Sequence, residues 1–382
     1  MEHTHFFIDP LDVLSFRGNK LFGEPGSLGA TVIPPTPSVV SGAIRSALLV
    51  HKGIDSNRYS AELTDNDPEL GTPARPGTFR LTGFTLGIRV GNLCEQIFPV
   101  PADLAIKRLE TGETEVQSIR PLRLGSTLKC SASTRLLAVL PEFSRVKPDT
   151  GYFLTSTGWS AHLNGERIRP TQLVSGSDLW KSELRVGIGL NTKHRSVQEG
   201  KLFTVQAVSF NKLEYRREWG DVGFIASVTG AVVPESLHLR LGGDGRAAIA
   251  KKISLKIPRA KYDQIVASGK CRVLLISQGV FRRGWSPFET DADGRFQFGE
   301  VRGRLVCAAV PRFEVISGFD IARRKPKVAQ RVAPVGSVYW IEDLEASEKQ
   351  LCNLVDSGLW SSELEEACRR AEGFNRFALG VY

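Results

Sequence analysis

The chain has 382 residues, of which 41% are hydrophobic and 24% are charged, and its formal net charge is +9. This composition excludes an intrinsically disordered chain, and the length indicates two domains of ordinary size rather than one compact core. The excess of lysine and arginine favours a polyanionic partner such as a nucleic acid, although proteins without one also reach this charge.

The cysteines and the apolar runs argue against three further classes of protein. The six cysteines form no CxxC pattern, which argues against a zinc ribbon and against a secreted disulfide scaffold. The N-terminal segment MEHTHFFIDPLD has neither the basic start nor the apolar core of a signal peptide. No apolar run approaches the roughly 20 residues of a membrane helix. We therefore expect a cytoplasmic protein with reduced cysteines and no membrane association.

The first unit along the chain is an apolar segment that ends at Phe16, followed by a basic, glycine-rich loop. The loop carries Arg17 and Lys20 as cations and Phe22 as an aromatic residue. This combination is typical of single-stranded RNA binding, because cations contact phosphates while planar rings stack on bases. An ordinary strand–loop–helix connection explains these residues equally well.

The loop leads into a predicted helix. Thr36 is a suitable N-cap, and Pro37 suits the first helical position because proline has no N–H to offer. Apolar residues with a helical period predict a face toward the core; they are Val39, Val40, Ala43, Ile44, Ala47 and Leu48. Ser38, Ser41 and Arg45 fall on the opposite face. Because a helix N-terminus offers free N–H groups and a positive dipole end, this face is a candidate phosphate site.

A polar, proline-rich stretch over residues 53–77 follows, and its composition predicts a long surface insertion. Strand-like runs come next. Alternating side chains predict a hairpin over about residues 184–210, with residues 191–200 as its connection. That connection holds three neighbouring basic residues, Lys193, His194 and Arg195.

After the Arg216-Arg217 pair and Trp219-Gly220, the strand pattern restarts at Val222, so we place a domain boundary near residues 211–220. The first domain is expected to span residues 1–215 and the second residues 216–382. Strands mixed with few, widely spaced helices predict an α+β fold rather than a doubly wound parallel sheet.

Two basic features lie in the second half of the chain. A glycine-rich turn at Gly242–Gly245 precedes Arg246, and an arginine there favours a phosphate over the paired metals of a polymerase-like site. A plain tight turn is the simpler interpretation of these residues. Residues 321–331 carry five cations and no acidic residue. We expect RNA or partner contacts from three of them: Arg323, Arg324 and Lys325. Residues 342–366 are acidic and helix-prone.

Catalytic motifs are weak. The sequence holds no GxxxxGK[ST] phosphate-binding loop and no GxGxxG at a strand-to-helix turn. His194 with Lys193 and Tyr215 would suit metal-independent RNA cleavage, which needs a general base and cations near the phosphate. A single histidine on an exposed loop lacks pre-organisation, so a solvated loop or a phosphate clamp is favoured. We expect no catalytic residues, no metal and no cofactor.

Five segments carry a family resemblance when they are taken together and in order. They are LDVLSFRGNKLFG with PPTPSVVSGAIRSALL, GIGL at 187–190 with EGKLF at 199–203, LGGDGR at 241–246, SGFDIARRKPKVAQRVAPVGSVY at 317–339, and GFNRFALGVY at 373–382. In these segments the chain resembles the Cas-five-like RAMP subunit of the type III-B CRISPR effector, the third-numbered subunit of the Cmr complex.

The resemblance implies a fold and a function. The fold would be two ferredoxin-like domains of the RRM or RAMP type, with a long β-hairpin projecting from the first. Proteins of this family do not cut RNA; they cap and hold the 5′ repeat-derived handle of the CRISPR RNA. They also join the large cyclase/nuclease subunit to the backbone RAMP subunits within a hetero-oligomeric ribonucleoprotein.

The resemblance also assigns roles to positions of this chain. The loop at 17–22 and the helix start at 36–45 would hold the handle, and the loop at 191–200 would be a thumb that displaces one base. Residues 373–380 correspond to a glycine-rich loop, in which Asn375 and Arg376 replace small residues. The candidate RNA-binding residues are Arg17, Lys20, Phe22, Ser38, Ser41, Arg45, Lys193, His194, Arg195, Arg246, Arg323, Arg324, Lys325, Asn375 and Arg376.

Two other functions stay open on the residues alone. One is a metal-independent endoribonuclease that matures CRISPR RNA, with His194 as its base. The other is a protein-only assembly module whose positive charge aids solubility, in which case binding to RNA would be absent or would ignore salt.

Overall fold

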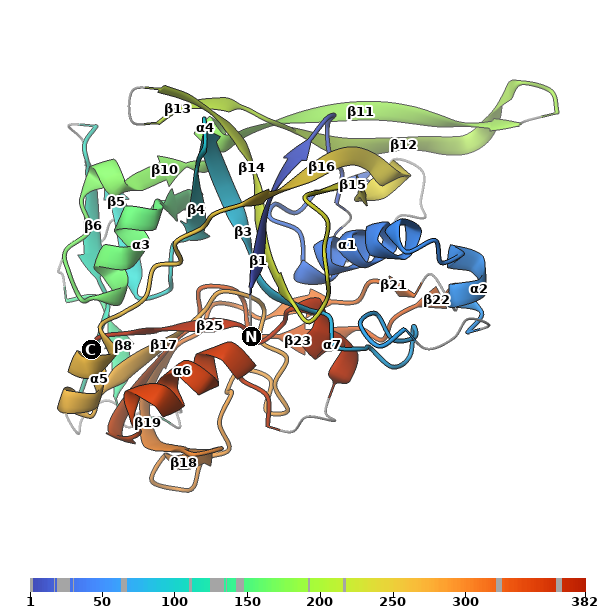
Figure 1. Ribbon diagram of the computed structural model, residues 1–382. Helices are drawn as coiled ribbons and strands as arrows, with labels where there is room; N and C mark the ends of the chain where they lie inside the picture. The colour runs from blue at the N-terminus through green and yellow to red at the C-terminus, as the bar shows by residue number, and fades with distance from the viewer. Residues whose placement is uncertain are drawn as a thin grey trace.

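The computed structural model shows a mixed α/β protein with several antiparallel sheets (Figure 1). It describes residues 3–16, 18, 28–29, 31–62, 67–109, 112–123, 134, 136–141, 148–191, 193–215, 218–320, 325–361 and 366–382. Across these ranges, no helix is long and apolar enough to cross a lipid bilayer.

The largest sheet is antiparallel and draws its strands from residues 4–253. Its order is β10 (Leu173–Ser175), β9 (Tyr152–Leu154), β4 (Leu93–Pro99), β3 (Arg80–Val90), β14 (Glu218–Thr229), β1 (Thr4–Pro10), β16 (Arg246–Ile253) and β15 (Ser236–Leu241). A further strand, β13 (Lys212–Tyr215), pairs with β14. The domain boundary expected near residues 211–220 therefore falls inside this sheet, in the β13–β14 hairpin.

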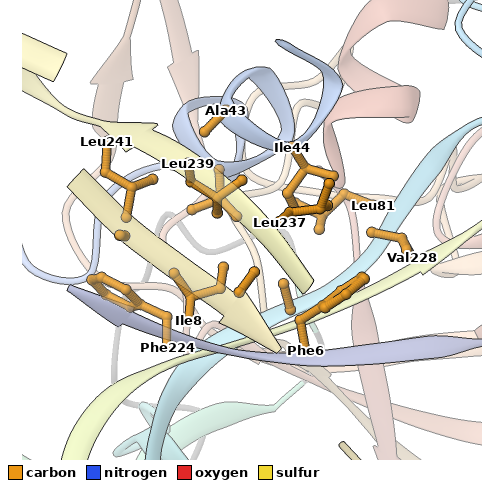
Figure 2. Packing of buried hydrophobic residues seen from close by; sticks show 14 of the residues in the cluster. Phe6, Ile8, Ala43, Ile44, Leu81, Phe224, Val228, Leu237, Leu239 and Leu241 are labelled. Carbon is orange, nitrogen blue, oxygen red and sulfur yellow. The ribbon is translucent and has the colours of Figure 1, made fainter. Parts of the chain in front are cut away.

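Helix α1 (Pro37–His51) covers one face of this sheet. Thr36 has the extended backbone of an N-cap and Pro37 is the first helical residue, as predicted, although the Thr36 side chain forms no hydrogen bond to the helix backbone. Ile44 and Ala43 pack over Phe6, Ile8 and other apolar side chains of the sheet (Figure 2). Phe16 also lies in this core.

The second sheet is built from the C-terminal part. Its order is β18 (Arg295–Phe298), β19 (Val301–Ala309), β24 (Val338–Glu345), β17 (Cys271–Leu275) and β25 (Phe377–Gly380). Three helices belong to this part: α5 (Tyr262–Ser268), α6 (Glu348–Ser357) and α7 (Ala367–Glu372). Tyr339, Ile341 and Leu275 are buried in its core. The acidic segment is thus partly strand and partly helix.

A third apolar core joins the two sheets. It contains Phe98 and Trp159 from the first part and Leu274 and Trp340 from the second. The remaining elements are η1 (Pro170–Gln172), η2 (Gly243–Gly245), α2 (Ser56–Ser60), α3 (Ser156–Leu163), α4 (Gly176–Leu179), and the paired strands β5 (Leu104–Arg108) with β6 (Thr114–Ser118), β7 (Arg120–Leu122) with β8 (Leu137–Val139), β20 (Glu314–Ile316) with β23 (Gln330–Val332), and β21 (Phe319–Asp320) with β22 (Lys325–Pro326).

The predicted hairpin is present as a long arm that projects from the body (Figure 1). It pairs β11 (Trp180–Asn191) with β12 (Ser196–Phe210), and β2 (Leu28–Gly29) adds a short parallel strand to β12. The connection between the long strands is shorter than the ten residues expected, because β12 already begins at Ser196.

The insertion at residues 53–77 packs against the body more closely than its composition suggested. Helix α2 lies within it, and Tyr59 and Leu70 are buried in the same core as α1. Tyr59 and Leu70 therefore fix it to the protein, whereas Asn57 and Arg58 are exposed.

Candidate nucleic-acid interface

The tip of the β11–β12 arm presents cations to solvent. Lys193, His194 and Arg195 are all exposed. Asn191 holds their backbone in a turn: its side-chain oxygen accepts hydrogen bonds from the N–H groups of Lys193 (3.0 Å) and His194 (3.3 Å), and its carbonyl accepts one from Arg195 (2.7 Å). Arg195 adopts a left-handed backbone with φ of 51°. The turn is therefore ordered by its own residues, and the basic side chains remain available.

One face of the arm is an exposed apolar strip. Alternate residues of a strand point to the same face, and the register places the residues of β11 opposite those of β12. The strip consists of six side chains that are each between 47% and 69% exposed: Leu184, Val186, Ile188, Leu190, Val197 and Leu202. Such a continuous apolar surface marks a site of interaction. The alternation of apolar residues in β11 signals this strip, although the sequence analysis predicts the hairpin without it.

The opposite face of the arm explains the Gly187-Ile188-Gly189 motif. A Cβ atom at Gly187 would lie 2.4 Å from the ring of Phe203, and one at Gly189 would lie 2.7 Å from the Lys201 side chain. The two glycines therefore leave room for side chains of β12 to lie across β11.

The candidate phosphate residues on α1 do not form one exposed face. Ser38 is half-buried, and its hydroxyl lies 3.0 Å from that of Thr36. Ser41 is fully buried, and its hydroxyl has no hydrogen-bond partner among the described atoms. The expectation that Ser41 faces away from the core is wrong, because α1 contacts both β15 and α7 and is therefore covered on more than one side.

Arg45 is used within the protein. Its guanidinium donates hydrogen bonds to the Tyr59 hydroxyl (2.8 Å) and to the carbonyl of Leu70 (2.9 Å). These contacts attach the insertion to α1, which makes Arg45 a structural residue in this conformation rather than a free phosphate ligand.

Several predicted residues lie outside the part of the chain that the structure describes. They are Arg17, Lys20, Phe22, Arg323 and Arg324. Lys325 is described: it is exposed on β22, and Figure 1 shows this strand well away from the arm tip. The structure therefore does not bring Lys325 together with the basic residues of the arm.

Arg246 directly follows the predicted glycine-rich turn. Asp244 and Gly245 have left-handed backbones, with φ of 60° and 58°. The Arg246 guanidinium lies 2.7 Å from the Asp12 carboxylate and 3.8 Å from that of Asp244, and it stays partly exposed. The N–H of Gly243 bonds to the carbonyl of Ser15 (2.7 Å), so the turn lies beside the segment that precedes residue 17. The partial exposure of its side chain keeps Arg246 as a candidate contact.

Asn375 and Arg376 are both engaged inside the fold. Asn375 is 1% exposed, and its side chain bonds to the backbone of Val280 and Leu359. Arg376 donates to the carbonyls of Val355 (2.9 Å) and Asp356 (2.8 Å) in the last turn of α6, where a cation suits the helix dipole. Burial lowers the pKa of Arg376 to about 10. Both side chains therefore have structural roles here.

The described candidates whose side chains stay exposed or partly exposed are therefore the arm tip, Lys325 and the partly paired Arg246. Within the described ranges, no three His, Cys, Asp or Glu side chains gather as a metal site requires. The exposed groups of the arm are cations at its tip and apolar side chains on one face. Such groups suit binding to phosphates and to planar or apolar partners.

A family model described as "CRISPR-associated protein (Cas_Cmr3)" matches residues 6–382. No curated protein sequence matches. Among solved structures, a chain of type III-B Cmr-beta bound to cognate target RNA and AMPPnP (state 1) is 15% identical over 88% of this chain and 86% of that chain, with a TM-score of 0.45.

Two further chains come from related structures. One, from type III-B Cmr-beta bound to cognate target RNA, is 14% identical over 98% of this chain and 96% of that chain, with a TM-score of 0.48. The other, from the apo state of type III-B Cmr-beta, is 13% identical over 66% of this chain and 97% of that chain, with a TM-score of 0.26. The assignment rests on the family model, which spans nearly the whole sequence. The chain therefore belongs to the Cas_Cmr3 family of CRISPR-associated proteins, as its sequence motifs predict.

Proposed function

We propose that this chain is a non-catalytic, RNA-binding subunit of a type III-B CRISPR effector complex. It holds the 5′ repeat-derived handle of the CRISPR RNA and joins the large cyclase/nuclease subunit to the backbone RAMP subunits. Family membership supports the complex. The observation that carries the RNA-binding part is the arm, which combines a cationic tip with an apolar face.

The physical chemistry of the arm supports assembly with RNA and protein. A two-stranded hairpin gains little stability alone in water, and six exposed apolar side chains add an unfavourable surface. Both are relieved when bases or neighbouring subunits cover the strip, and cations at the tip then contact phosphates. An arm of this kind suits a subunit that works inside a ribonucleoprotein.

We also assign a ferredoxin-like core to each sheet. In the first sheet, β3, β14, β1 and β16 are neighbours, which is the order second, third, first and fourth along the chain. In the second sheet, β19, β24, β17 and β25 have the same order. This order and its antiparallel pairing are those of ferredoxin-like folds. The described helices occupy one crossover in each unit, since α1 follows β1 and α6 follows β24.

The proposal that this subunit is non-catalytic rests on the surroundings of His194, the candidate general base for RNA cleavage. Its backbone N–H is bonded to Asn191, while its imidazole has no hydrogen bond to any other residue that the structure describes. A general base for RNA cleavage needs a fixed position and an oriented ring. The exposed tip supplies neither, which favours phosphate contact over proton transfer.

The double variant Lys193→Ala/Arg195→Gly tests the proposal. Glycine suits the left-handed backbone at position 195, so the turn is kept while two cations are removed. We expect the affinity for a repeat-derived oligoribonucleotide to fall about tenfold at near-physiological salt, because two phosphate contacts are lost. The salt slope of binding should decrease by about 1.4. Fluorescence anisotropy over a salt series measures both quantities.

Lys251→Ala/Lys256→Ala is the matched control, because it removes the same charge from exposed residues outside the arm. Equal losses in the two variants would contradict a specific role of the arm tip. Incubation with labelled precursor RNA completes the test. Cleavage that disappears in His194→Ala would instead establish the ribonuclease function.

A further inference from the structure

A cavity of about 310 Å³ lies in the C-terminal part, away from the arm. It is bounded by residues between 280 and 289, by the first two residues of β23, by residues 359–361 after α6, and by Glu366 and Asn375. Phe281, Phe288 and Trp360 supply aromatic walls, and Phe281 and Trp360 are partly exposed. This volume is at the lower end of the range of about 300–1,000 Å³ that is usual for small-molecule sites. It therefore suits one nucleotide-sized group rather than a longer segment.

The walls of this cavity are fixed by contacts within the protein. A Cβ atom at Gly279 would lie 2.3 Å from the Phe281 ring, so the glycine lets this ring pack directly on the backbone. Asn375 accepts a hydrogen bond from the N–H of Val280 (2.6 Å) and donates to the carbonyls of Val280 (3.1 Å) and Leu359 (2.8 Å). One buried amide therefore joins two walls. A cavity held in this way is largely preformed, which lowers the entropic penalty of binding.

The rim of the cavity carries cations that the protein does not neutralise. Arg283 and Arg331 form no ion pair with another described residue, and the Arg331 guanidinium lies 4.9 Å from the centre of the exposed Phe313 ring. Arg282 lies 3.6 Å from Glu289, and both side chains are largely exposed. The other carboxylate at the cavity, Glu366, accepts a hydrogen bond from Gln330 (2.9 Å). Two arginines at an aromatic pocket favour an anion that carries a planar ring.

We propose that this cavity binds one nucleotide, with its base against Phe281 and Trp360 and its phosphate on Arg283 and Arg331. Exposed rings at Trp285 and Phe313 continue the aromatic surface beside the cavity. The nucleotide has two possible sources with the same chemistry. When it belongs to bound RNA, the inference rests on the proposed function, and the cavity is a second contact site besides the arm. When it is a free mononucleotide, the inference stands without that function.

The full chain is tested with two probes, a repeat-derived oligoribonucleotide that contains 4-thiouridine and adenosine 5′-monophosphate. In the wild-type protein, we expect photocrosslinks from the RNA in the peptides that contain Phe281 or Trp360. In Arg283→Ala/Arg331→Ala, these crosslinks should disappear and the RNA affinity should fall about tenfold. Arg295→Ala/Arg302→Ala is the control, because it removes two exposed arginines, on β18 and β19, that lie outside the cavity.

The two probes distinguish bound RNA from a free mononucleotide as the source of the nucleotide. They also test the cavity site separately from the proposed RNA-binding function. Loss of RNA crosslinks without competition by the mononucleotide assigns the cavity to bound RNA. Mononucleotide binding that the cavity variant abolishes assigns it to a free nucleotide, even in a protein that binds no RNA. If RNA still binds through the arm, crosslinks to the cavity are absent and the mononucleotide does not bind, the inference is overturned while the proposed function stands. Crosslink mapping uses the wild-type chain, so it decides the question even if a variant misfolds.

Discussion

Replacing Arg272 with methionine is expected to lower the free energy of unfolding by about 3–5 kcal/mol, because the change removes one of the two charged or polar partners of a buried carboxylate. Arg272 lies on β17 with 9% of its side chain exposed, and the Asp103 side chain is 2% exposed. The guanidinium lies 2.5 Å from the Asp103 carboxylate, which also lies 3.0 Å from His162 Nε2. It further donates to the carbonyls of His162 (2.5 Å) and Val381 (3.0 Å). Methionine keeps the side-chain volume but offers no donor.

The position of this cluster makes the expected effect large. Asp103 immediately precedes β5, His162 lies on α3 and Arg272 belongs to the second sheet, so the cluster connects both parts of the protein. Urea denaturation followed by tryptophan fluorescence and by circular dichroism measures the change. Glu235→Ala is the surface control: its carboxylate is 86% exposed at 3.0 Å from Lys252, and we expect a loss below about 1 kcal/mol. Similar losses in the two variants would contradict a stabilising role of the cluster.

The pH dependence of stability gives a second measure of the same loss. Burial alone would raise the pKa of Asp103, but its interactions with His162 and Arg272 outweigh burial and lower the pKa from 3.8 to about 2. A carboxyl group with a lowered folded-state pKa stabilises the fold above its unfolded pKa, and this stabilisation is lost as the pH falls through the folded pKa. Wild-type stability should therefore fall by about 2 kcal/mol through this group between about pH 5 and pH 2. Arg272→Met should lose part of that dependence, because only His162 then remains to lower the pKa of Asp103.

The local elements of the fold could be predicted because their signals are contained in a few neighbouring residues. Thr36 and Pro37 start α1 as expected, and the turn at Gly242–Gly245 has the left-handed residues that its glycines indicated. The arm was visible in the alternation of its strands. The domain boundary was not predictable in this way. Strand β1 pairs with β14 and β16, more than 200 residues later, and composition carries no signal for such pairing.

The candidate site could be predicted only where the side chains stay exposed. The tip residues Lys193, His194 and Arg195 are free to bind because a turn at the end of an arm has nothing to cover it. Arg45 fails as a free ligand because the insertion folds back and supplies Tyr59 and Leu70 as hydrogen-bond partners. The helical period of α1 gives no information about hydrogen-bond partners that come from another segment of the chain. The cavity was missed for the same reason, since its walls come from segments about 50–100 residues apart.

Asn375 is the second position at which a single change should have a large effect. We expect Asn375→Ala to lower the free energy of unfolding by about 2–4 kcal/mol, because three backbone groups of the half-buried Val280 and the buried Leu359 lose this partner. The backbone adds to the loss: Asn375 has a φ of 58°, and alanine tolerates this left-handed conformation less well than asparagine, by about 1 kcal/mol. Thermal and urea unfolding of the full chain measure the combined change.

Two further variants at this position separate the hydrogen bonds from the backbone strain. Asn375→Gly removes the strain and the three hydrogen bonds together, so it should be about 1 kcal/mol less destabilising than Asn375→Ala after allowance for the flexibility of glycine in the unfolded chain. Asn375→Asp keeps the acceptor for the Val280 N–H but places a carboxylate oxygen against two carbonyls. It should therefore destabilise the fold at least as much as alanine, and less so at acidic pH, where the protonated group can again donate. If the aspartate variant were as stable as the wild type, the amide would not be what holds the two cavity walls together.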